Sequence, residues 1–448
     1  MKTLQQFPYR RVLVLGLAKS GTAAADLLLD SGIPVRINDW KATKEDPAVR
    51  SLEERGAELI LGSHPSSALD GIDLVVKNPG IPYENPMVEA AMEKDIPIIT
   101  EIELAGMLHE GPVVAITGSN GKTTTTTLID AMLDASECRS RIAGNIGEVA
   151  VEVARETTHD DTLVVELSSF QLLGIESFRP NISVLLNIFE AHLDYHKTLE
   201  NYQEAKARIF MNQSEGDFLV YNADDPVIER FIGNANGTLV PFSVTRKVEG
   251  AYVEGGTVYF NDEPILERSE IVLVGDHNLE NILAAIAASK LAGASTEGIR
   301  NILTTFTGVP HRLQFVSKFN DRLFYNDSKA TNILATSKAL RAFEQPVILL
   351  AGGLDRGNGF DELIPYLDHV KALVVFGETA EKIKDAGRKA GIDTIEKVDN
   401  VEQAALMSYK LSEAGDVILL SPACASWDQY KTFEDRGHMF VQAVHKLK

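Results

Sequence analysis

Cysteine and tryptophan are scarce in this sequence, with two of each among 448 residues. Cys138 and Cys424 lie far apart and form no C-x-x-C pair, which argues against a disulfide framework and against a zinc site. So little cysteine is typical of a protein that works in a reducing compartment. We therefore expect a cytoplasmic protein.

Long apolar runs are also absent. No uninterrupted run approaches the roughly 20 residues that are needed to span a bilayer. The polar segment 1–10 lacks the apolar centre of a signal peptide. The sequence thus predicts no cleaved leader and no membrane insertion.

Positive charge is in deficit, because 43 lysine and arginine residues face 64 aspartate and glutamate residues and leave a formal net charge of -21. Broad binding to nucleic acid or to an anionic membrane needs clustered positive charge. The composition therefore argues against a nucleic-acid partner. A site for a phosphorylated ligand would have to be local.

Apolar residues are ample, at 44% of the chain, and the length predicts two to four domains. Short apolar runs alternate with helical patterns along the whole sequence, which is typical of α/β domains. Breaker residues at 308–310 indicate one boundary. We predict an α/β protein of three domains, at 1–102, 103–308 and 309–448.

A series of short apolar runs predicts strands buried in parallel sheets. These runs lie at 12–15, 35–38, 74–77, 97–100, 113–117, 163–167, 183–188, 218–221, 323–326, 347–351, 372–376 and 417–421. Helical patterns lie at 21–30, 125–133 and 276–292. The order of the first group predicts a Rossmann-like domain.

A glycine-rich loop follows the predicted strand 113–117. It reads GSNGKTT and leads into a predicted helix, and this order of strand, loop and helix suits a phosphate cradle. Lys122 would add a full positive charge, and Thr123 would place a hydroxyl on magnesium. The spacing between Gly118 and Gly121 is shorter than in the general G-x-x-x-x-G-K-[ST] motif. An ordinary glycine turn before a helix is the alternative interpretation.

An acidic partner for this loop is needed, because magnesium on a nucleotide takes hard oxygen ligands. Glu166 could supply one, since it lies near the end of the run 163–167 and the carboxyl ends of parallel strands face the ligand crevice. A glutamate at such a position is more often a solvated edge residue, and both interpretations stay open.

One lysine lies inside the apolar stripe of a predicted helix whose N-cap is Thr198. Lys206 follows Tyr202 by four residues and precedes Ile209 by three, so it shares their face. The simpler explanation is that its stem packs while its ammonium reaches water. The alternative is a buried amine of lowered pKa that reacts with carbon dioxide to form a magnesium-binding carbamate.

A histidine could complete a second metal site with that lysine. His192 lies in the loop after the predicted strand 183–188, where it could meet Lys206 at the same sheet edge. A single histidine is more often a structural polar residue, so this hypothesis needs further support.

The N-terminal loop 16–21 reads GLAKSG, with alanine at the middle glycine of G-x-G-x-x-G. Asp39 follows at the end of the next predicted strand. Taken alone, these features predict NAD binding at a helix N-terminus. An NAD-dependent oxidoreductase would leave the loop 118–124 without a task.

Several segments together resemble the Mur ligase superfamily. They are TGSNGKTT at 117–124, ELSSFQL at 166–172, DHN at 276–278 and PHR at 310–312. NDSKATN at 326–332 and SPACASWDQY at 421–430 resemble the members that add D-glutamate. The Asp-Asn-Pro-Arg motif of diaminopimelate-adding relatives is not found in the sequence.

This resemblance implies an ATP-dependent, amide-forming ligase of peptidoglycan precursor synthesis. Its partners would be UDP-N-acetylmuramoyl-L-alanine and D-glutamate, and its cofactors ATP and Mg²⁺ at two sites, where Mn²⁺ could substitute. The first domain would be Rossmann-like and bind the UDP substrate, the second would be a P-loop-type ATPase, and the third would be Rossmann-like and bind the amino acid. We expect a monomer.

The resemblance also assigns individual residues. The catalytic residues would be Lys122, Glu166, His192 and Lys206, with Thr123 and Glu166 on one magnesium and His192 and carbamylated Lys206 on the other. ATP would be bound by Gly118, Ser119, Asn120, Gly121, Lys122, Thr123, Thr124, Asn278, Asn281, Arg312 and Asp327. The substrates would be bound by Gly16, Lys19, Ser20, Asp39, Asn78, Pro79, Gly80, Asn145, Ser168, His311, Lys329, Thr331, Arg356, Ser426 and Phe433. Arg356 aligns where some members have a lysine.

A third possible function is a nucleotide-binding switch in which ATP orders the domains and nothing is ligated. Glu166, His192 and Lys206 would then have no shared task. ATP binding without phosphate release in the presence of all substrates would favour this alternative.

Overall fold

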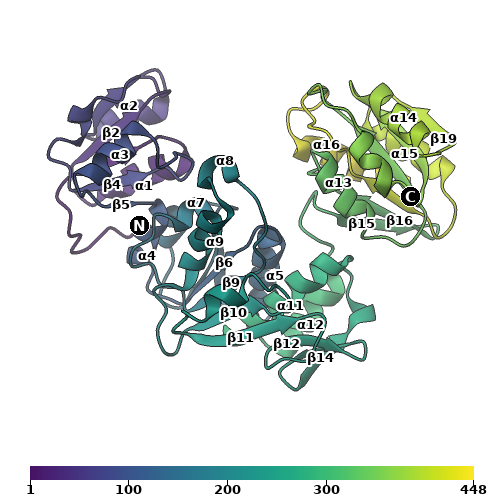
Figure 1. The fold of residues 1–448 in the computed structure, drawn as a ribbon, viewed down its shortest axis with the longest axis horizontal. Coiled ribbons are helices and arrows are strands. Elements are labelled where there is room, and N and C mark those ends of the chain that lie inside the picture. The colour runs from purple at the N-terminus through teal and green to yellow at the C-terminus, as the bar shows by residue number, and fades with distance from the viewer. Residues whose placement is uncertain (448) are drawn as a thin grey trace. The chain divides into compact units, whose positions relative to one another are not determined.

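The computed structural model describes residues 1–447, and the chain divides into two compact units. The first unit comprises Met1–Glu270 and Glu280–Ile302, and the second comprises Ile271–Leu279 and the residues from Leu303 on. Two sheets lie in the first unit and one in the second (Figure 1). The α/β prediction is confirmed.

The first sheet is parallel, with the order β3-β2-β1-β4-β5. Its strands are β1 (Val12–Leu15), β2 (Val35–Asp39), β3 (Glu58–Leu61), β4 (Leu74–Lys77) and β5 (Ile98–Ile99). Its helices are α1 (Lys19–Asp30), α2 (Pro47–Glu54), η1 (Ser66–Leu69) and α3 (Pro86–Glu93). The sequence does not predict β3, because this edge strand is only half-buried and lacks a continuous apolar run. The strand predicted at 97–100 extends beyond both ends of β5.

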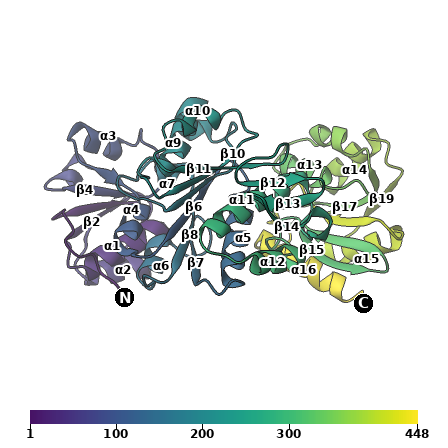
Figure 2. The same cartoon turned by 90° about the horizontal axis from the view of Figure 1, so that it is seen from below.

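The second sheet has the order β14-β13-β12-β11-β10-β9-β6-β8-β7. Its strands are β6 (Val113–Thr117), β7 (Ser140–Gly144), β8 (Thr162–Glu166), β9 (Ile182–Leu185), β10 (Phe218–Asn222), β11 (Thr238–Ser243), β12 (Ala251–Glu254), β13 (Thr257–Phe260) and β14 (Glu263–Glu267). The four strands of this sheet that the sequence predicts, β6, β8, β9 and β10, pair parallel as expected. The sequence does not predict β12, β13 and β14, which pair antiparallel with one another (Figure 2). Gly255 and Gly256 both adopt positive φ, which permits the tight turn between β12 and β13.

Helices follow most strands of this domain. They are α4 (Glu101–Leu108), α5 (Lys122–Asp134), α6 (Ala150–Ala154), α7 (Ser169–Leu172), α8 (Leu193–His196), α9 (Leu199–Ala207), η2 (Arg208–Phe210), α10 (Glu229–Ile232), η3 (Arg268–Glu270), α11 (Asp276–Leu291) and α12 (Thr296–Thr305). Helix α9 packs against α7 and α8 (Figure 1). The helix predicted after Thr198 is confirmed, and the Thr198 hydroxyl accepts a hydrogen bond from the Asn201 backbone N–H.

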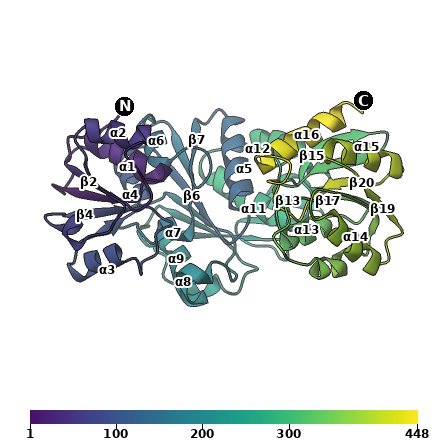
Figure 3. The same cartoon turned by 90° about the horizontal axis from the view of Figure 1, so that it is seen from above.

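The third sheet has the order β15-β16-β20-β17-β18-β19, with only β15 antiparallel to its neighbour. Its strands are β15 (Gln314–Phe319), β16 (Arg322–Asn326), β17 (Val347–Gly352), β18 (Val370–Phe376), β19 (Thr394–Lys397) and β20 (Val417–Leu420). Its helices are α13 (Ile333–Leu340), η4 (Asp361–Tyr366), α14 (Ala380–Lys389), α15 (Val401–Leu411) and α16 (Phe433–His445). Helices α13 and α14 cover one face, and α15 and α16 the other (Figure 3).

The first two domains share a hydrophobic core. One cluster of buried residues contains Leu27 of α1, Ile102 of α4 and Val151 of α6. The domain boundary predicted at 102/103 falls inside α4, and the boundary at 308/309 falls between α12 and β15. Both boundaries stay predictions. Within residues 1–447, no helix combines the length and the apolar character that crossing a membrane requires.

Candidate active site

The glycine loop after β6 is held in a conformation that only glycine tolerates at one point. Gly121 is the N-cap of α5 and has φ 85°, in the left-handed region. A Cβ at this residue would also clash with Asn281 Oδ1. The predicted nucleotide residues Gly121 and Asn281 are therefore neighbours, and the N-terminus of α5 opens onto the loop.

The segment that follows the neighbouring strand β9 holds the rest of the loop in place through hydrogen bonds. Asn187 accepts from the Ser119 N–H through its backbone oxygen at 2.9 Å, and from the Asn120 N–H through Oδ1 at 2.9 Å. The Ser119 hydroxyl lies 3.0 Å from the backbone oxygen of Phe189 and 3.0 Å from the Tyr202 hydroxyl. The loop is thus tied to the segment after β9 and to α9.

Glu166 joins two of the predicted ligand residues. It is the last residue of β8, and its side chain is buried rather than solvated. The Thr123 hydroxyl donates to Oε2 at 2.9 Å, and the Asn145 amide donates to Oε1 at 2.8 Å. This places a hydroxyl from α5, a carboxylate from β8 and an amide from the loop after β7 in one group.

Two lysines meet at a single carbonyl oxygen. Gly118 O accepts from Lys122 Nζ at 2.7 Å and from Lys206 Nζ at 2.8 Å. Lys206 is 1% exposed, so the explanation in which its ammonium reaches water is wrong. Burial, followed by the nearby Lys122 charge, lowers the pKa of Lys206 well below its usual value, while Glu166 opposes this shift.

A cluster of aromatic and histidine rings surrounds this lysine. Lys206 Nζ lies 4.8 Å from the centre of the Tyr202 ring, and His192 lies 6.3 Å from the same ring. Phe170 contacts His192 at 5.1 Å and stacks on His196 at 5.4 Å. The sequence does not single out Tyr202, Phe170 or His196 as site residues, because aromatic residues at these spacings are equally typical of a hydrophobic core.

His196 makes a hydrogen bond that has a structural role. Its Nε2 lies 2.9 Å from the Ser169 hydroxyl, next to Ser168, which caps α7. Burial, with Lys206 and His192 adding to the effect, lowers the pKa of His196 to about 4. The ring is therefore neutral at neutral pH.

The donor atoms suit a hard cation at one point. The hydroxyl of Thr123 and the carboxylate of Glu166 are oxygen ligands of the kind that Mg²⁺ prefers. Among residues 1–447, no three His, Cys, Asp or Glu side chains gather in a way that could hold a metal ion.

The predicted UDP-binding residues gather at the carboxyl edge of the first sheet. Gly16 has φ 90°, and Asn78 Nδ2 donates to the Ser20 hydroxyl at 3.0 Å. Asp39 accepts from the backbone N–H groups of Leu17, Lys41 and Ala42, each at 2.7 Å. Burial raises the pKa of Asp39, but these three donors outweigh it and the net shift is downward. Lys19 begins α1, and Pro79 and Gly80 complete the turn after Asn78.

The second unit gathers another group of the predicted residues. His311 Nδ1 lies 2.9 Å from Asn326 Nδ2, and its ring contacts Phe433 at 6.2 Å. Lys329 Nζ lies 5.1 Å from the centre of the Phe433 ring. Asp327 accepts from the Ser421 hydroxyl at 2.8 Å, and burial raises its pKa to about 7.

Of the remaining predicted residues of this unit, Asn278 lies in the first turn of α11 and the others lie on loops. Thr331 donates its backbone N–H to Lys329 O at 2.9 Å, and the Arg356 guanidinium lies 5.2 Å from the Trp427 ring. The Ser426 hydroxyl is buried and has no hydrogen-bond partner within the described part of the chain. Asn278 donates to Val274 O at 2.7 Å, and Arg312 directly follows His311. Thr124 lies in the first turn of α5, in the first unit.

Arg436 is a buried residue beside the predicted site residues of the second unit, and sequence reasoning missed it. It is 1% exposed and donates to Ser328 O at 2.8 Å, to Cys424 O at 3.0 Å and to Gly352 O at 3.4 Å. These three carbonyls belong to the loops that carry Lys329, Ser426 and Arg356. A signal exists, since Arg436 shares the apolar face of α16 as Lys206 does that of α9.

Three family models match the chain in order. The Mur ligase MurD-like N-terminal domain matches residues 10–100, the Mur ligase middle domain matches 116–289, and the Mur ligase glutamate ligase domain matches 311–424. The first two matches each contain one group of the residues described above, and the third contains His311, Asp327 and Lys329, while Ser426 and Phe433 lie beyond its end.

Curated relatives are similar over the full length. The UDP-N-acetylmuramoylalanine–D-glutamate ligase of Oceanobacillus iheyensis is 60% identical, with 100% of each chain covered. The ligases of the same name from Geobacillus kaustophilus and Bacillus subtilis are 60% and 56% identical, again with 100% of each chain covered.

Solved structures share the fold at lower identity. The UDP-N-acetylmuramate–alanine ligase MurC of Thermotoga maritima has a TM-score of 0.57 at 19% identity, covering 98% of this chain and 100% of that one. The MurF ligase of Thermotoga maritima in complex with ADP has a TM-score of 0.58 at 18% identity, covering 93% and 96%.

Proposed function

The chain belongs to the Mur ligase family, and we propose on that basis that it joins D-glutamate to UDP-N-acetylmuramoyl-L-alanine with ATP as the energy source. It is an ATP-dependent, amide-forming ligase of peptidoglycan precursor synthesis. The substrates are those named by relatives that are 53–60% identical over the full chain. We place the reaction in the cytoplasm, where ATP and nucleotide sugars are made, and expect a monomer.

One observation in the structure carries the chemistry. Lys122 and Lys206, from different helices, converge on Gly118 O, and Glu166 binds Thr123 at the start of the same helix as Lys122. The Lys122 charge, the N-terminus of α5 and a carboxylate that can hold magnesium are therefore placed where a transferring phosphoryl group would develop negative charge. An NAD-binding oxidoreductase would leave this arrangement without a task, and a passive nucleotide switch would leave the buried Lys206 without one.

The reaction has two steps. A carboxylate oxygen of the substrate's alanine attacks the γ-phosphorus of ATP, the bond to the bridging oxygen breaks, and ADP leaves. The amine of D-glutamate then attacks the carbonyl carbon of the acyl phosphate. The carbon–oxygen bond breaks, phosphate leaves with the former carboxylate oxygen, and the amine loses a proton as the amide forms. The residues contribute mainly by positioning and charge neutralisation.

Magnesium fits the oxygen donors of this site. Thr123 and Glu166 would hold one ion, and His192 with a Lys206 carbamate would hold the second, so that the ions offset charge on the phosphoryl oxygens. The proximity of two amines at Gly118 O supports the carbamate. A carbamate would replace the Lys206 ammonium, which the Lys122 ammonium repels, by a negatively charged group beside Lys122.

The flanking groups suit the two building blocks. Gly16, Ser20, Asp39 and the turn 78–80 would hold the UDP part, with the diphosphate at the N-terminus of α1. In the second unit, Lys329 and Arg356 would face the carboxylates of D-glutamate, and the unpartnered Ser426 hydroxyl would bond one of them. Asn278, Asn281, His311, Arg312 and Asp327 would contact the nucleotide or the acyl phosphate.

The test is phosphate release with UDP-N-acetylmuramoyl-L-alanine while the amino acid is varied. D-glutamate, L-alanine, L-lysine and diaminopimelate would each be supplied with ATP and Mg²⁺. We expect D-glutamate to support turnover and the other three to give about background rates. Turnover that is fastest with another amino acid would overturn the assignment.

A further inference from the structure

A lysine in the N-terminal domain is buried without an acidic partner. Lys77 ends β4, is 1% exposed, and has no carboxylate within ion-pair distance in residues 1–447. Its ammonium donates to three backbone oxygens, those of Asn78 at 3.3 Å, Pro79 at 3.2 Å and Ile81 at 2.7 Å. Burying a charge in this way is costly unless its hydrogen bonds compensate, so the position is a candidate for a specific task.

The three carbonyls belong to the turn that follows β4. This turn, Asn78–Ile81, contains the residues that the proposed function assigns to the UDP substrate. One cation with three donors fixes three successive parts of the turn at once. An apolar side chain of similar length would fill the space but would remove the one donor that these three carbonyls share.

The same ammonium reaches the central domain. Lys77 Nζ lies 3.2 Å from the Tyr195 hydroxyl, and that hydroxyl donates to Ile81 O at 3.0 Å. Tyr195 lies in α8, which begins directly after His192. The Tyr195 ring packs at 4.5 Å against Phe170, whose other neighbours are His192 and His196.

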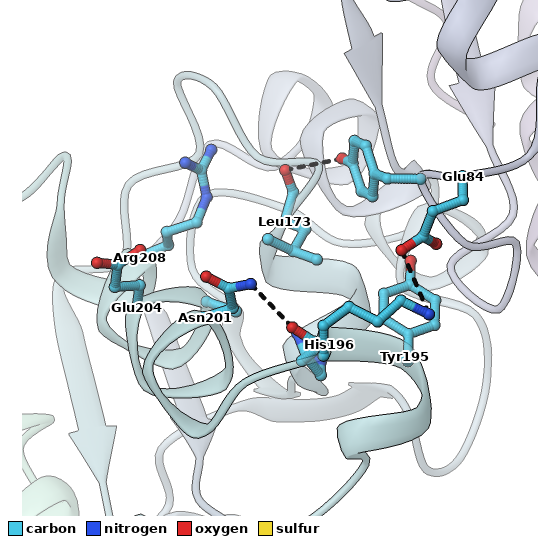
Figure 4. A pocket seen from close by; sticks show the side chains of 10 residues that line it. Glu84, Leu173, Tyr195, His196, Asn201, Glu204 and Arg208 are labelled. Carbon is cyan, nitrogen blue, oxygen red and sulfur yellow. Dashed lines mark hydrogen bonds and ion pairs between the residues drawn. The ribbon is translucent and has the colours of Figure 1, made fainter.

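Two further contacts hold the segments together beside this link. The Tyr83 hydroxyl donates to Leu173 O at 3.1 Å, and Lys197 pairs with Glu84 at 3.3 Å (Figure 4). Both contacts join residues just after the turn to the residues that directly follow α7 and α8. They border a pocket of about 330 Å³ whose lining includes Tyr195. The ion pair is half-exposed and contributes little, so the buried Lys77 contacts carry most of the coupling.

The chain of contacts ends at the phosphate loop. His192 lies 6.3 Å from the Tyr202 ring, and the Tyr202 hydroxyl lies 3.0 Å from that of Ser119. The turn that would hold the UDP sugar and the loop that would hold the ATP phosphates are therefore connected through packed side chains. Catalysis depends on such alignment, since small displacements of reacting groups are costly.

We propose that Lys77 is a positioning residue that locks the turn 78–81 to Tyr195 and so aligns the alanine carboxylate with the phosphate loop. This inference rests on the proposed function. In this role Lys77 acts through the turn and through α8, since its buried ammonium is surrounded by their polar atoms. A lysine suits the role because the three N–H groups of its ammonium can be shared among converging carbonyls and a hydroxyl.

The experiment compares Lys77→Met, Tyr195→Phe and the double variant in full-length enzyme. We expect Lys77→Met to raise KM for UDP-N-acetylmuramoyl-L-alanine about tenfold and to lower kcat, while KM for ATP and D-glutamate stays within about twofold. Tyr195→Phe, which removes one hydroxyl and keeps the ring, should give a smaller change of the same kind. The double variant should show no larger kinetic loss than Lys77→Met, because both substitutions break the same contact between the turn 78–81 and Tyr195.

Lys94→Met is the matched control, since Lys94 is an exposed lysine of the same domain that pairs with Asp70 at 3.8 Å. It should have wild-type kinetics. Unchanged kinetics in Lys77→Met, or an equal loss for all three substrates with a lowered melting temperature, would overturn the inference. If Lys77→Met does not fold, Tyr195→Phe decides, and wild-type kinetics in that variant would refute the link. A wild-type enzyme that releases no phosphate would instead refute the proposed function.

Discussion

At the scale of single residues, the site is defined by charged groups that have been removed from water. Within residues 1–447, Lys206 has no carboxylate hydrogen-bonded to it, and its amine shares Gly118 O with Lys122. Two ammonium groups in such proximity repel, and burial adds to the cost of the second charge. A neutral amine at this position is the form that reacts with carbon dioxide.

The carbamate can be tested by replacement and rescue. We expect Lys206→Ala to lose turnover by about 100-fold or more, because the second cation loses an oxygen ligand. A short-chain carboxylic acid in the assay should restore part of the activity by occupying the vacated space. The measurement is phosphate release against acid concentration.

Lys318→Ala serves as its control, since Lys318 is an exposed lysine paired with Asp321. This variant should keep full activity and show no response to the acid. A Lys206→Ala enzyme with normal turnover would remove the carbamate from the mechanism.

The position of Lys206 on the apolar face of its helix made it recognisable from the sequence. Other buried cationic residues were not recognised in this way. Arg436 has the same signature on α16, where an arginine shares a face with Phe440 and Val444. Lys77 has no such signature, because β4 is buried on both faces and leaves no polar side to compare. The hydrogen-bond partners of both are backbone oxygens, which no residue pattern identifies.

At the scale of elements, α9 delivers Lys206 and its start is set by one side chain. The Thr198 hydroxyl accepts from the Asn201 N–H at 3.1 Å and so satisfies a donor at the helix N-terminus. We expect Thr198→Ala to lower the free energy of unfolding by about 1 kcal/mol. Chemical denaturation would measure this, and Thr198→Ser should restore most of the loss. Equal stability of the alanine and serine variants would contradict the capping role.

Helix α4 contains a buried acid that links stability to pH. Burial raises the pKa of Glu101 to about 7, against 4.5 for the exposed group. The folded protein therefore binds this proton more tightly, so the contribution is present below pH 4.5 and is lost as pH rises through 7. Stability should fall by up to about 3 kcal/mol over this range on account of Glu101.

Glu101→Gln removes that titration. Thermal unfolding at pH 5 and pH 7.5 should show a smaller difference in melting temperature for Glu101→Gln than for the wild type. Glu89→Gln, at an exposed position of α3, should behave as wild type. An unchanged pH dependence in Glu101→Gln would show that other groups cause the effect.

Central elements were predictable and peripheral ones were not. β1, β4 and β6 have continuous apolar runs because both faces are covered, and their predicted bounds match the structure. β3 and β19 lie at sheet edges, where half-exposed residues interrupt the run. Their existence depends on neighbouring strands rather than on their own residues.

At the scale of the whole molecule, three groups of predicted ligand residues accompany the three sheets in the order of the chain. The sequence motifs identified the family and the order of domains. The sequence did not predict the shared core of the first two domains, because this core arises from contacts among the helices α1, α4 and α6, which are distant in sequence. The roles of the site residues and the exact domain boundaries stay predictions.

The central claim is that the substrate carboxylate is activated by phosphorylation before the amide forms. UDP-N-acetylmuramoyl-L-alanine labelled with ¹⁸O in its alanine carboxylate tests this directly, with mass spectrometry of the released phosphate. The two-step reaction predicts one ¹⁸O in each phosphate that accompanies a new amide bond. Amide formation that gives unlabelled phosphate would contradict it.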